Sequence, residues 1–153
     1  MKSNLISIFI GICGAILAMQ FVQPVVVNGT SMHPYLEDGD FIIMEKYDKE
    51  PDYDDVVIVK EGERLIIKRV IGKPGDAISF DGTSVYVNGQ LRHEDYIPFA
   101  TAPGEDVTLK DNEYYVLGDN RPDSMDSRTI GPITKDKIKG IAKVRLYPKP
   151  QTV

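Results

Sequence analysis

The chain has 153 residues, and its 18 Lys and Arg against 23 Asp and Glu give a formal net charge of −5 at pH 7. This length suits one ordinary domain with its own core. An acidic chain lacks the basic surface that nucleic-acid binding requires. One cysteine cannot form an internal disulfide, and two histidines argue against a multi-histidine metal site. We therefore expect a single domain with no nucleic-acid partner, no metal and no cofactor.

The N-terminal segment is strongly apolar. From Leu5 to Val22, a stretch of 18 residues, no side chain is charged. That length is sufficient for a transmembrane helix, since about 20 residues cross a bilayer core of about 30 Å. Lys2 precedes the span, so the positive-inside rule places the N-terminus in the cytoplasm. The sequence predicts a single-pass protein of the cytoplasmic membrane, with the tip and transmembrane helix at 1–23 and an extracytoplasmic domain at 24–153.

Two other interpretations of the N-terminus stay open. Residues 29–31 have the small-x-small pattern of a cleavable secretory signal, although a long polar gap separates them from the apolar stretch. Cys13 could carry a lipid, although Ile12 stands where a small residue is expected. A retained anchor fits the sequence better than either alternative.

Past Pro24 the chain changes to short β-branched runs that turn residues separate. Strands are expected within 25–27, 40–47, 55–72, 73–91, 113–120 and 138–148. The Asn88-Gly89 pair between two of these runs favours a type I′ hairpin. No sustained helical period follows the N-terminal segment, and residues 92–112 are polar enough for a surface excursion. The pattern predicts a mainly β domain, an antiparallel barrel or sandwich.

Ser31 lies in the stretch NGTSMHPYLEDGDF, residues 28–41, between small residues and Met-His-Pro. As a nucleophile it would need a base. His33 is only two residues away, and neighbouring positions of one extended segment rarely aim both side chains at one point. His93 lies in the charged turn LRHEDY, where solvent exposure is expected. A Ser-His-Asp triad stays possible, because its members need not be close in sequence.

Lys68 offers a second candidate for the base. It interrupts the apolar run RLIIKRVIG, and strand alternation places it on one face with Ile66 and Val70. Full burial can lower a lysine pKa by about 3–5 units, and a neutral amine can accept a hydroxyl proton. On an edge strand the lysine would instead extend to water. This segment by itself favours the edge-strand interpretation.

The stretch GDNRPDSMDSR, residues 118–128, follows an expected strand with a glycine turn. It is either a polar surface loop or a supporting element for the site. In the second case Ser124 would orient an amine by a hydrogen bond, while Asp126 and Arg128 pair to hold the loop. Such i, i+2 pairs are common and often contribute little to stability.

Four stretches, in this order behind an apolar N-terminus, resemble the bacterial type I signal peptidases of the short Gram-positive type. They are GTSMHPYL, IKRVIGKPGD, LGDNRPDSMDSR and GPITKDKIKGIAKVRLYP, and the resemblance covers nearly the whole chain. The family implies a membrane-anchored β fold that removes signal peptides from secreted preproteins, after small residues, on the outer face of the cytoplasmic membrane. It also implies a second subdomain, which must be small here and lie near 76–112. Signal peptides and the lipid bilayer are then the expected partners.

The resemblance also assigns roles by position. Ser31 matches the nucleophile and Lys68 the general base. Ser124 matches the serine that hydrogen-bonds the lysine, Asp126 and Arg128 match its supporting ion pair, and Asp119 lies in the same motif. The substrate-binding positions are Val25, Val27, Met32, Leu36 and Ile67, beside which an extended substrate could add as a strand at 25–28 and 64–67.

Two positions depart from the family pattern. Gly29 stands where some members carry a serine whose hydroxyl helps to hold the oxyanion, so backbone N–H groups must contribute more. Ser31 and Gly29 are the expected oxyanion positions. Tyr35 replaces the usual threonine, and its ring could reshape the rim of the site.

Three rival functions are weighed against this resemblance. Self-cleaving serine–lysine repressors share the chemistry, but they carry a DNA-binding module or a disordered arm rather than a membrane span. Non-enzymatic assembly factors of some pilus loci share the fold, but they generally lack the serine–lysine pair. A membrane-anchored binding domain would make the ordered set of motifs a coincidence.

Overall fold

A computed structural model describes residues 7–9, 11, 20–47 and 50–147. Within this part of the chain every recorded strand pair is antiparallel. The α-helix α2 (Ser127–Ile130) and the 3-10 helix η1 (Lys135–Lys137) are each about one turn long. The predicted mainly β, antiparallel architecture is therefore confirmed.

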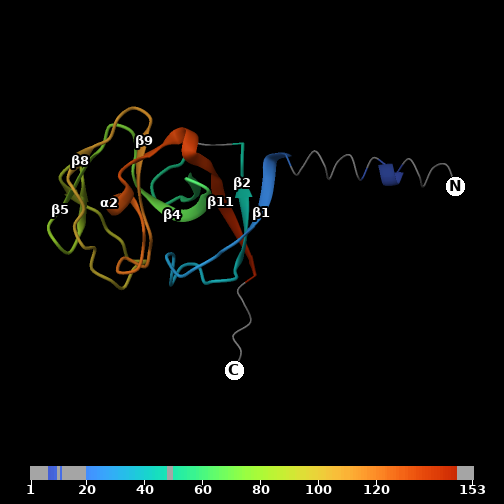
Figure 1. Ribbon diagram of the computed structural model, residues 1–153, viewed down its shortest axis with the longest axis horizontal. Helices are drawn as coiled ribbons and strands as arrows, with labels where there is room; N and C mark the ends of the chain where they lie inside the picture. Colours follow the sequence, from blue (N-terminus) through green and yellow to red (C-terminus); the bar gives the residue numbers. More distant parts are fainter. Residues whose placement is uncertain (1–6, 10, 12–19, 48–49, 148–153) are drawn as a thin grey trace, which may run out of the picture.

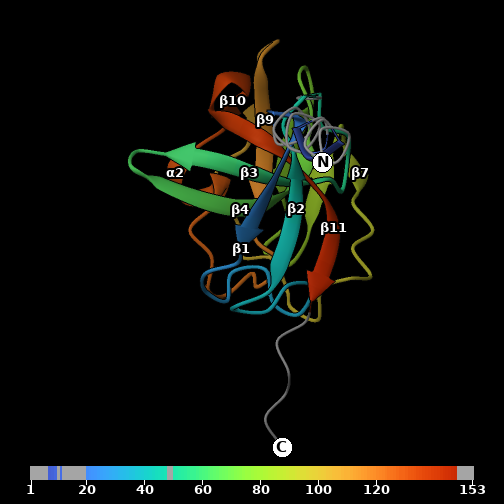
Figure 2. The same ribbon diagram turned by 90° about the vertical axis from the view of Figure 1, so that its right-hand side faces the viewer.

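The larger sheet has seven strands. In spatial order they are β1 (Val22–Val26), β2 (Phe41–Glu45), β11 (Ile138–Tyr147), β3 (Val56–Glu61), β4 (Arg64–Gly72), β9 (Glu113–Leu117) and β10 (Ile133–Thr134). Figure 2 shows β1, β2 and β11 side by side, and the β3–β4 hairpin reaching to one side of the molecule. The order of these described strands is open, with β1 and β10 at its edges, so the sheet does not close on itself.

The smaller sheet has four strands in the order β7 (Gln90–Leu91), β6 (Val85–Val87), β5 (Ala77–Phe80) and β8 (Val107–Thr108). Figure 1 shows β5 and β8 at the end of the molecule far from β1. Asn88 and Gly89 connect β6 to β7 with φ values of 54° and 75°. Two positive values are what a type I′ turn requires, so the predicted hairpin is confirmed.

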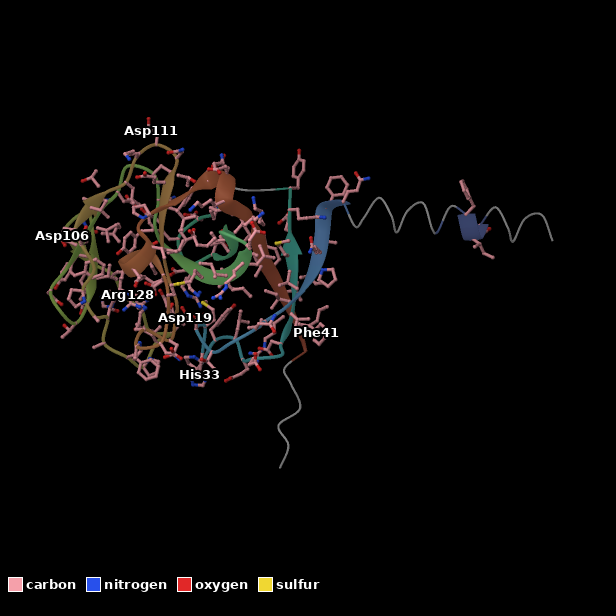
Figure 3. All side chains as sticks on the ribbon, in the orientation of Figure 1. His33, Phe41, Asp106, Asp111, Asp119 and Arg128 are labelled. Atoms are coloured by element: carbon pink, nitrogen blue, oxygen red, sulfur yellow. The ribbon has the colours of Figure 1, made fainter. Side chains whose placement is uncertain are left out.

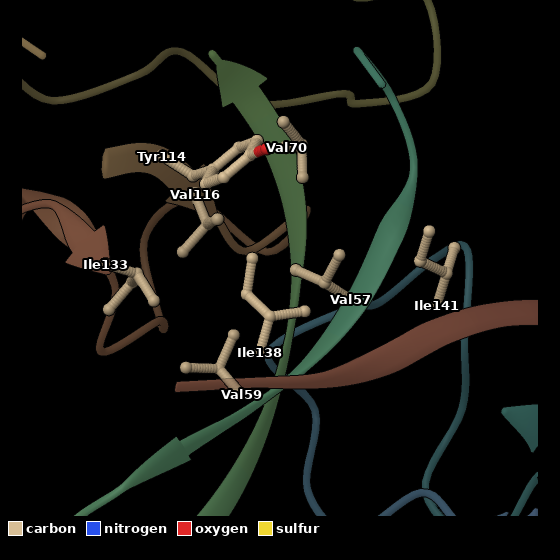
Figure 4. Packing of buried hydrophobic residues seen from close by; sticks show 8 residues of the cluster. All are labelled: Val57, Val59, Val70, Tyr114, Val116, Ile133, Ile138 and Ile141. Carbon is tan, nitrogen blue, oxygen red and sulfur yellow. The ribbon is translucent and has the colours of Figure 1, made fainter. Parts of the chain in front are cut away.

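β3 is buried on both faces and separates two apolar clusters. Strand alternation sends Val57 and Val59 to one face and Val56 and Ile58 to the other. The first face belongs to the cluster in Figure 4, which joins β3, β4, β9, β10 and β11. The second face packs under the turn that carries Ser31, and its cluster consists of Val27, Met32, Leu36, Ile42, Met44, Val56 and Ile58. The Ser31 turn thus rests on a packed core.

The predicted membrane span, residues 5–22, and Cys13 lie for the most part outside the described residues. Among those that are described, no helix is long and apolar enough to cross a membrane. The last residue of the predicted span, Val22, is instead the first residue of β1. β1 therefore begins three residues before the strand expected at 25–27. Pairing with β2 explains the earlier start, since the register runs from Val22↔Glu45 to Val26↔Phe41.

Candidate active site

Ser31 and Lys68 meet between β1 and β4. Ser31 begins the turn that follows β1, and Lys68 comes from the middle of β4. Lys68 Nζ lies 2.7 Å from Ser31 Oγ, although 37 positions separate the two residues in the sequence. The amine also donates a hydrogen bond to the Ile67 carbonyl oxygen at 2.8 Å. The structure thus brings together the serine and the lysine that the sequence singled out.

Burial changes the protonation of Lys68. Its side chain is only 2% exposed, and no carboxylate in the described part of the chain forms an ion pair with it. Loss of hydration lowers the pKa of Lys68 to about 8, against the opposing fields of Asp126 and Asp119. A neutral amine is therefore abundant at mildly alkaline pH. The edge-strand interpretation, with the lysine extended to water, is wrong.

Neither histidine contacts Ser31 in the described structure. His33 Nδ1 lies 2.9 Å from Glu37 Oε1, with both side chains about half exposed. Figure 3 shows His33 at the outer rim of the molecule, away from the interior position of Asp119. His93 is exposed. The geometry therefore offers Ser31 a lysine and not a histidine as its nearest base.

Asp126 organises the loop between β9 and α2. Its carboxylate is fully buried and accepts hydrogen bonds from the Gly118 N–H at 3.0 Å and from Arg128 Nε and Nη2 at 2.9 and 2.8 Å. It also caps the N-terminus of α2 by accepting from the Arg128 N–H. The predicted pairing of Asp126 with Arg128 is present, and it fixes both ends of the loop.

Ser124 does not make the predicted hydrogen bond to the lysine. Its Oγ is buried and has no hydrogen-bond partner among the described residues. The hydroxyl packs instead against Gly118, where an added Cβ would overlap Ser124 Oγ and lie 2.5 Å from the Ser31 carbonyl oxygen. The space between the loop and the Ser31 turn is thus too narrow for any side chain at position 118.

Asp119 pairs with Arg69, the residue that follows the lysine in β4. Arg69 Nε and Nη2 donate to the two carboxylate oxygens at 2.9 and 2.6 Å, and both side chains are buried. Sequence patterns do not single out Arg69, because strand alternation places it on the face opposite Lys68. The signal that could have found it is Asp119 itself, since a buried carboxylate requires a cationic or hydrogen-bonding partner.

The Ser31 turn is hydrogen-bonded to the same loop. Asn120 donates its backbone N–H to the Ser31 carbonyl at 3.0 Å and its side-chain Nδ2 to the Thr30 carbonyl at 3.1 Å. Thr30 Oγ1 donates to Asp123 Oδ2 at 3.2 Å. Sequence patterns did not single out Thr30 or Asn120 for this role. Together these contacts hold the backbone of Ser31 against the loop.

A cavity of about 170 Å³ opens beside Ser31 and Lys68, between residues 25–29 and 65–68. Four of the five predicted substrate-binding residues line it, namely Val25, Val27, Met32 and Ile67. Leu36 does not, and this part of the prediction is wrong. The turn at 31–35 reverses the chain, so that Leu36 packs into the core and borders a separate cavity with Ile42 and Val56.

The Gly29 N–H is not available to an oxyanion, because it donates to Asp38 Oδ1 at 2.8 Å. This corrects the predicted participation of Gly29 as a backbone donor. The N–H of Ser31 has no acceptor within the described residues, and Ser31 also lines the cavity. Of the two predicted oxyanion donors, only Ser31 keeps a free N–H at this place.

No group of three or more His, Cys, Asp or Glu side chains in the described ranges is arranged to hold a metal ion. The site itself offers a partly buried hydroxyl–amine pair beside a cavity lined mainly by apolar side chains. Such a pair supports nucleophilic attack on a carbonyl carbon.

Comparison with known proteins identifies the family. A family model described as "Signal peptidase, peptidase S26" matches residues 2–147. The chain belongs to the signal peptidase family. Signal peptidase I S of Bacillus subtilis (strain 168) is 35% identical over 159 residues, which cover 93% of this chain and 86% of that protein. Signal peptidase I of Bacillus licheniformis is 33% identical over 160 residues, with coverage of 93% and 86%.

A solved structure agrees with the sequence relatives. The crystal structure of a signal peptidase I from Enterococcus faecalis matches with a TM-score of 0.50 at 26% identity, over 60% of this chain and 95% of that chain. The resemblance to type I signal peptidases is confirmed, and this signal peptidase family member is a serine endopeptidase. The ordered motifs are therefore not a coincidence in an unrelated binding domain.

Proposed function

We propose that this enzyme removes N-terminal signal peptides from exported preproteins through a serine–lysine acyl-enzyme mechanism. The observation that carries the proposal is the partly buried contact of 2.7 Å between Ser31 Oγ and Lys68 Nζ. Its relatives in two Bacillus species bear the name signal peptidase I. Signal peptides of secreted preproteins are the substrates that this name implies.

In the first half of the reaction, neutral Lys68 accepts the proton of Ser31 as Oγ attacks the carbonyl carbon of the scissile bond. The Ser31 N–H donates to the oxyanion that forms. Lys68 then gives its proton to the leaving amine, the C–N bond breaks, and an ester to Ser31 remains. In the second half, Lys68 takes a proton from a water molecule as the water oxygen attacks the ester carbon. The bond from that carbon to Ser31 Oγ then breaks, the new carboxyl terminus is released, and Lys68 returns the proton to Oγ.

The sheet leaves two free edges for an extended substrate. Among the described strands β1 pairs only with β2, and β4 pairs with β9 only from Arg69 onward. Each of the segments 25–28 and 64–67 therefore has one edge beside the cavity with no described strand paired to it, which suits β-augmentation. Val27, Met32 and Ile67 give the cavity a narrow apolar wall, which favours small side chains of the A-x-A type.

An exposed apolar face supports a position at the membrane. Pro24 and Val144 both pair with Ile43, and Val26 pairs with Phe41, so these residues share one face of the sheet. Val26, Phe41 and Val144 are 44%, 46% and 51% exposed. Contiguous apolar surface of this kind marks an interaction site. We assign it to the outer leaflet of the cytoplasmic membrane, with the N-terminal segment as the anchor and the catalytic domain outside.

The decisive experiment uses full-length protein in detergent and a preprotein with an A-x-A cleavage site. We expect a shortened product whose new N-terminus, read by mass spectrometry, begins directly after the second alanine. A preprotein with Leu in place of that alanine serves as the matched control and should stay intact. Equal cleavage of both preproteins, or of neither, would contradict the proposed specificity.

A further inference from the structure

The guanidinium of Arg69 lies over two tyrosine rings from different parts of the fold. Its Cζ is 4.5 Å from the ring centroid of Tyr35 and 4.2 Å from that of Tyr96. A cation over an aromatic face is attracted by the ring quadrupole. Tyr35 belongs to the Ser31 turn, and Arg69 directly follows Lys68 in β4. The contact between Arg69 and Tyr35 therefore connects β4, which carries Lys68, to the turn that carries Ser31.

The remaining contacts of Arg69 fix its side chain from the other directions. Asp119 takes two hydrogen bonds from it, and the Asp54 carbonyl takes a third from Nη1 at 2.9 Å. Arg69 is only 5% exposed. Its position thus determines how β4 sits against the loop after β9.

Tyr96 is held by the same loop. Its hydroxyl donates to Glu94 Oε1 at 2.8 Å. Glu94 in turn receives two hydrogen bonds from Arg121, at 2.7 and 2.6 Å, and Arg121 Nε donates to the Gly118 carbonyl at 3.0 Å. The excursion that contains Tyr96 is therefore connected to the loop that packs against Ser31.

We propose that Tyr35 and Tyr96 are positioning residues of the reaction, because their rings hold Arg69 and so fix Lys68 relative to Ser31. The proposal rests on the proposed role of Lys68 as the base. Neither tyrosine lines the cavity beside Ser31. Their effect therefore passes through Arg69 and not through contact with the substrate.

The test compares Tyr35→Leu with Tyr35→Phe in the full-length enzyme, using a soluble peptide substrate. Leucine keeps apolar bulk but loses the aromatic face, whereas phenylalanine keeps that face. We expect kcat to fall roughly 2- to 30-fold in Tyr35→Leu, with KM nearly unchanged, and to stay within about twofold in Tyr35→Phe. Tyr96→Leu should behave like Tyr35→Leu. Tyr47→Leu is the matched control, since Tyr47 is 78% exposed and its ring packs against Phe21.

A pH profile separates positioning from a general loss of folded enzyme. The described charges that act on the Lys68 amine are Asp126 and Asp119, which Arg128 and Arg69 neutralise. A loosened Arg69 leaves Asp119 less neutralised, so the lysine holds its proton more tightly. The acid limb of kcat/KM should then move to higher pH in the leucine variants and stay in place in Tyr35→Phe. Partial unfolding would lower the amplitude without moving the limb.

Two outcomes would overturn the inference. One is a Tyr35→Leu enzyme with the kcat and acid limb of the unmodified protein. The other is a changed KM and side-chain preference at constant kcat, which would mean that the ring touches the substrate. Cleavage by Ser31→Ala or Lys68→Ala would instead refute the proposed mechanism, so the two failures are distinguishable.

Discussion

The Lys68 amine and the Arg69 guanidinium are neighbours in β4, yet burial affects them differently. An amine can lose its proton when its hydration is removed, whereas a guanidinium stays charged and must be paired. Lys68 accordingly has no ion-pair partner within the described residues, while Arg69 has a bidentate one in Asp119. The strand thus supplies a titratable base and a permanent cation side by side.

The first prediction concerns the serine and the lysine. Ser31→Ala, Lys68→Ala and Lys68→Arg should each lower kcat on the order of 10⁶-fold, as loss of a nucleophile or its base does elsewhere. Arginine fails in this place because it does not deprotonate. His33→Ala and His93→Ala should keep most activity and serve as controls. A dead histidine variant would favour a triad instead.

The second prediction concerns pH. The pKa of Lys68 is lowered to about 8, so the neutral amine becomes the main form above that pH. Below it, each pH unit should reduce kcat/KM about tenfold, because only the neutral fraction can accept a proton. Initial rates on a soluble peptide between pH 6 and 10 measure this limb. A flat profile would contradict a lysine base.

The third prediction concerns Gly118. In Gly118→Ala the new Cβ must displace either Ser124 or the Ser31 carbonyl, which Asn120 holds in place. Overpacking of this kind costs about 1–3 kcal/mol of stability, and it should also move Ser31 away from Lys68. We expect a lower midpoint of thermal unfolding together with a loss of kcat larger than the unfolded fraction explains. Unchanged activity would show that the loop at 118–126 accommodates the added methyl group without moving Ser31, which would contradict the prediction.

At the scale of elements, the sequence predicted the strands that carry long β-branched runs. β2, β3, β4, β9 and β11 all lie where such runs occur, and the β3–β4 hairpin turns at Gly62 with φ of +57°. The two-residue strands β8 and β10 were missed, because their pairing partners and not their own residues define them. The helix α2 was missed, because four residues are too few to show a helical period. The tertiary contacts of the site were equally hidden, since no local pattern pairs Asp119 with Arg69 or leaves Ser124 unbonded.

The fourth prediction concerns the start of α2. Asp126→Ala would remove the cap of α2, leave the Gly118 N–H without its acceptor and leave the Arg128 guanidinium with the Arg121 carbonyl but no carboxylate partner. Breaking a buried pair in this way destabilises by about 3–5 kcal/mol. Chemical denaturation measures the loss. The control is Lys110→Ala, which breaks an exposed pair with Glu113 and should cost less than about 1 kcal/mol. Equal losses in both variants would contradict the structural role of Asp126.

Across the whole molecule, only a short stretch of chain separates the catalytic serine from the apolar N-terminal segment. Eight residues, 23–30, separate Val22 from Ser31, and even fully extended they span less than about 30 Å. Four of them belong to β1, which pairs with β2 and contributes to the exposed apolar face. An anchor before β1 would therefore hold the serine near the membrane surface and raise the effective concentration of membrane-bound substrates.

The last prediction tests this positioning. A protein that begins at Gln20 keeps β1 and the serine–lysine pair, so it should cleave a soluble peptide at nearly the full-length rate. It should process preproteins inserted in vesicles poorly, because tethering no longer concentrates it beside the substrate. The measurement is the ratio of the two activities in both proteins. Phe41→Ser in the full-length protein should lower only the vesicle activity, and by less, since Phe41 is one part of the apolar face. If truncation reduced both activities equally, the N-terminal segment would be needed for folding, and positioning at the membrane would not explain it.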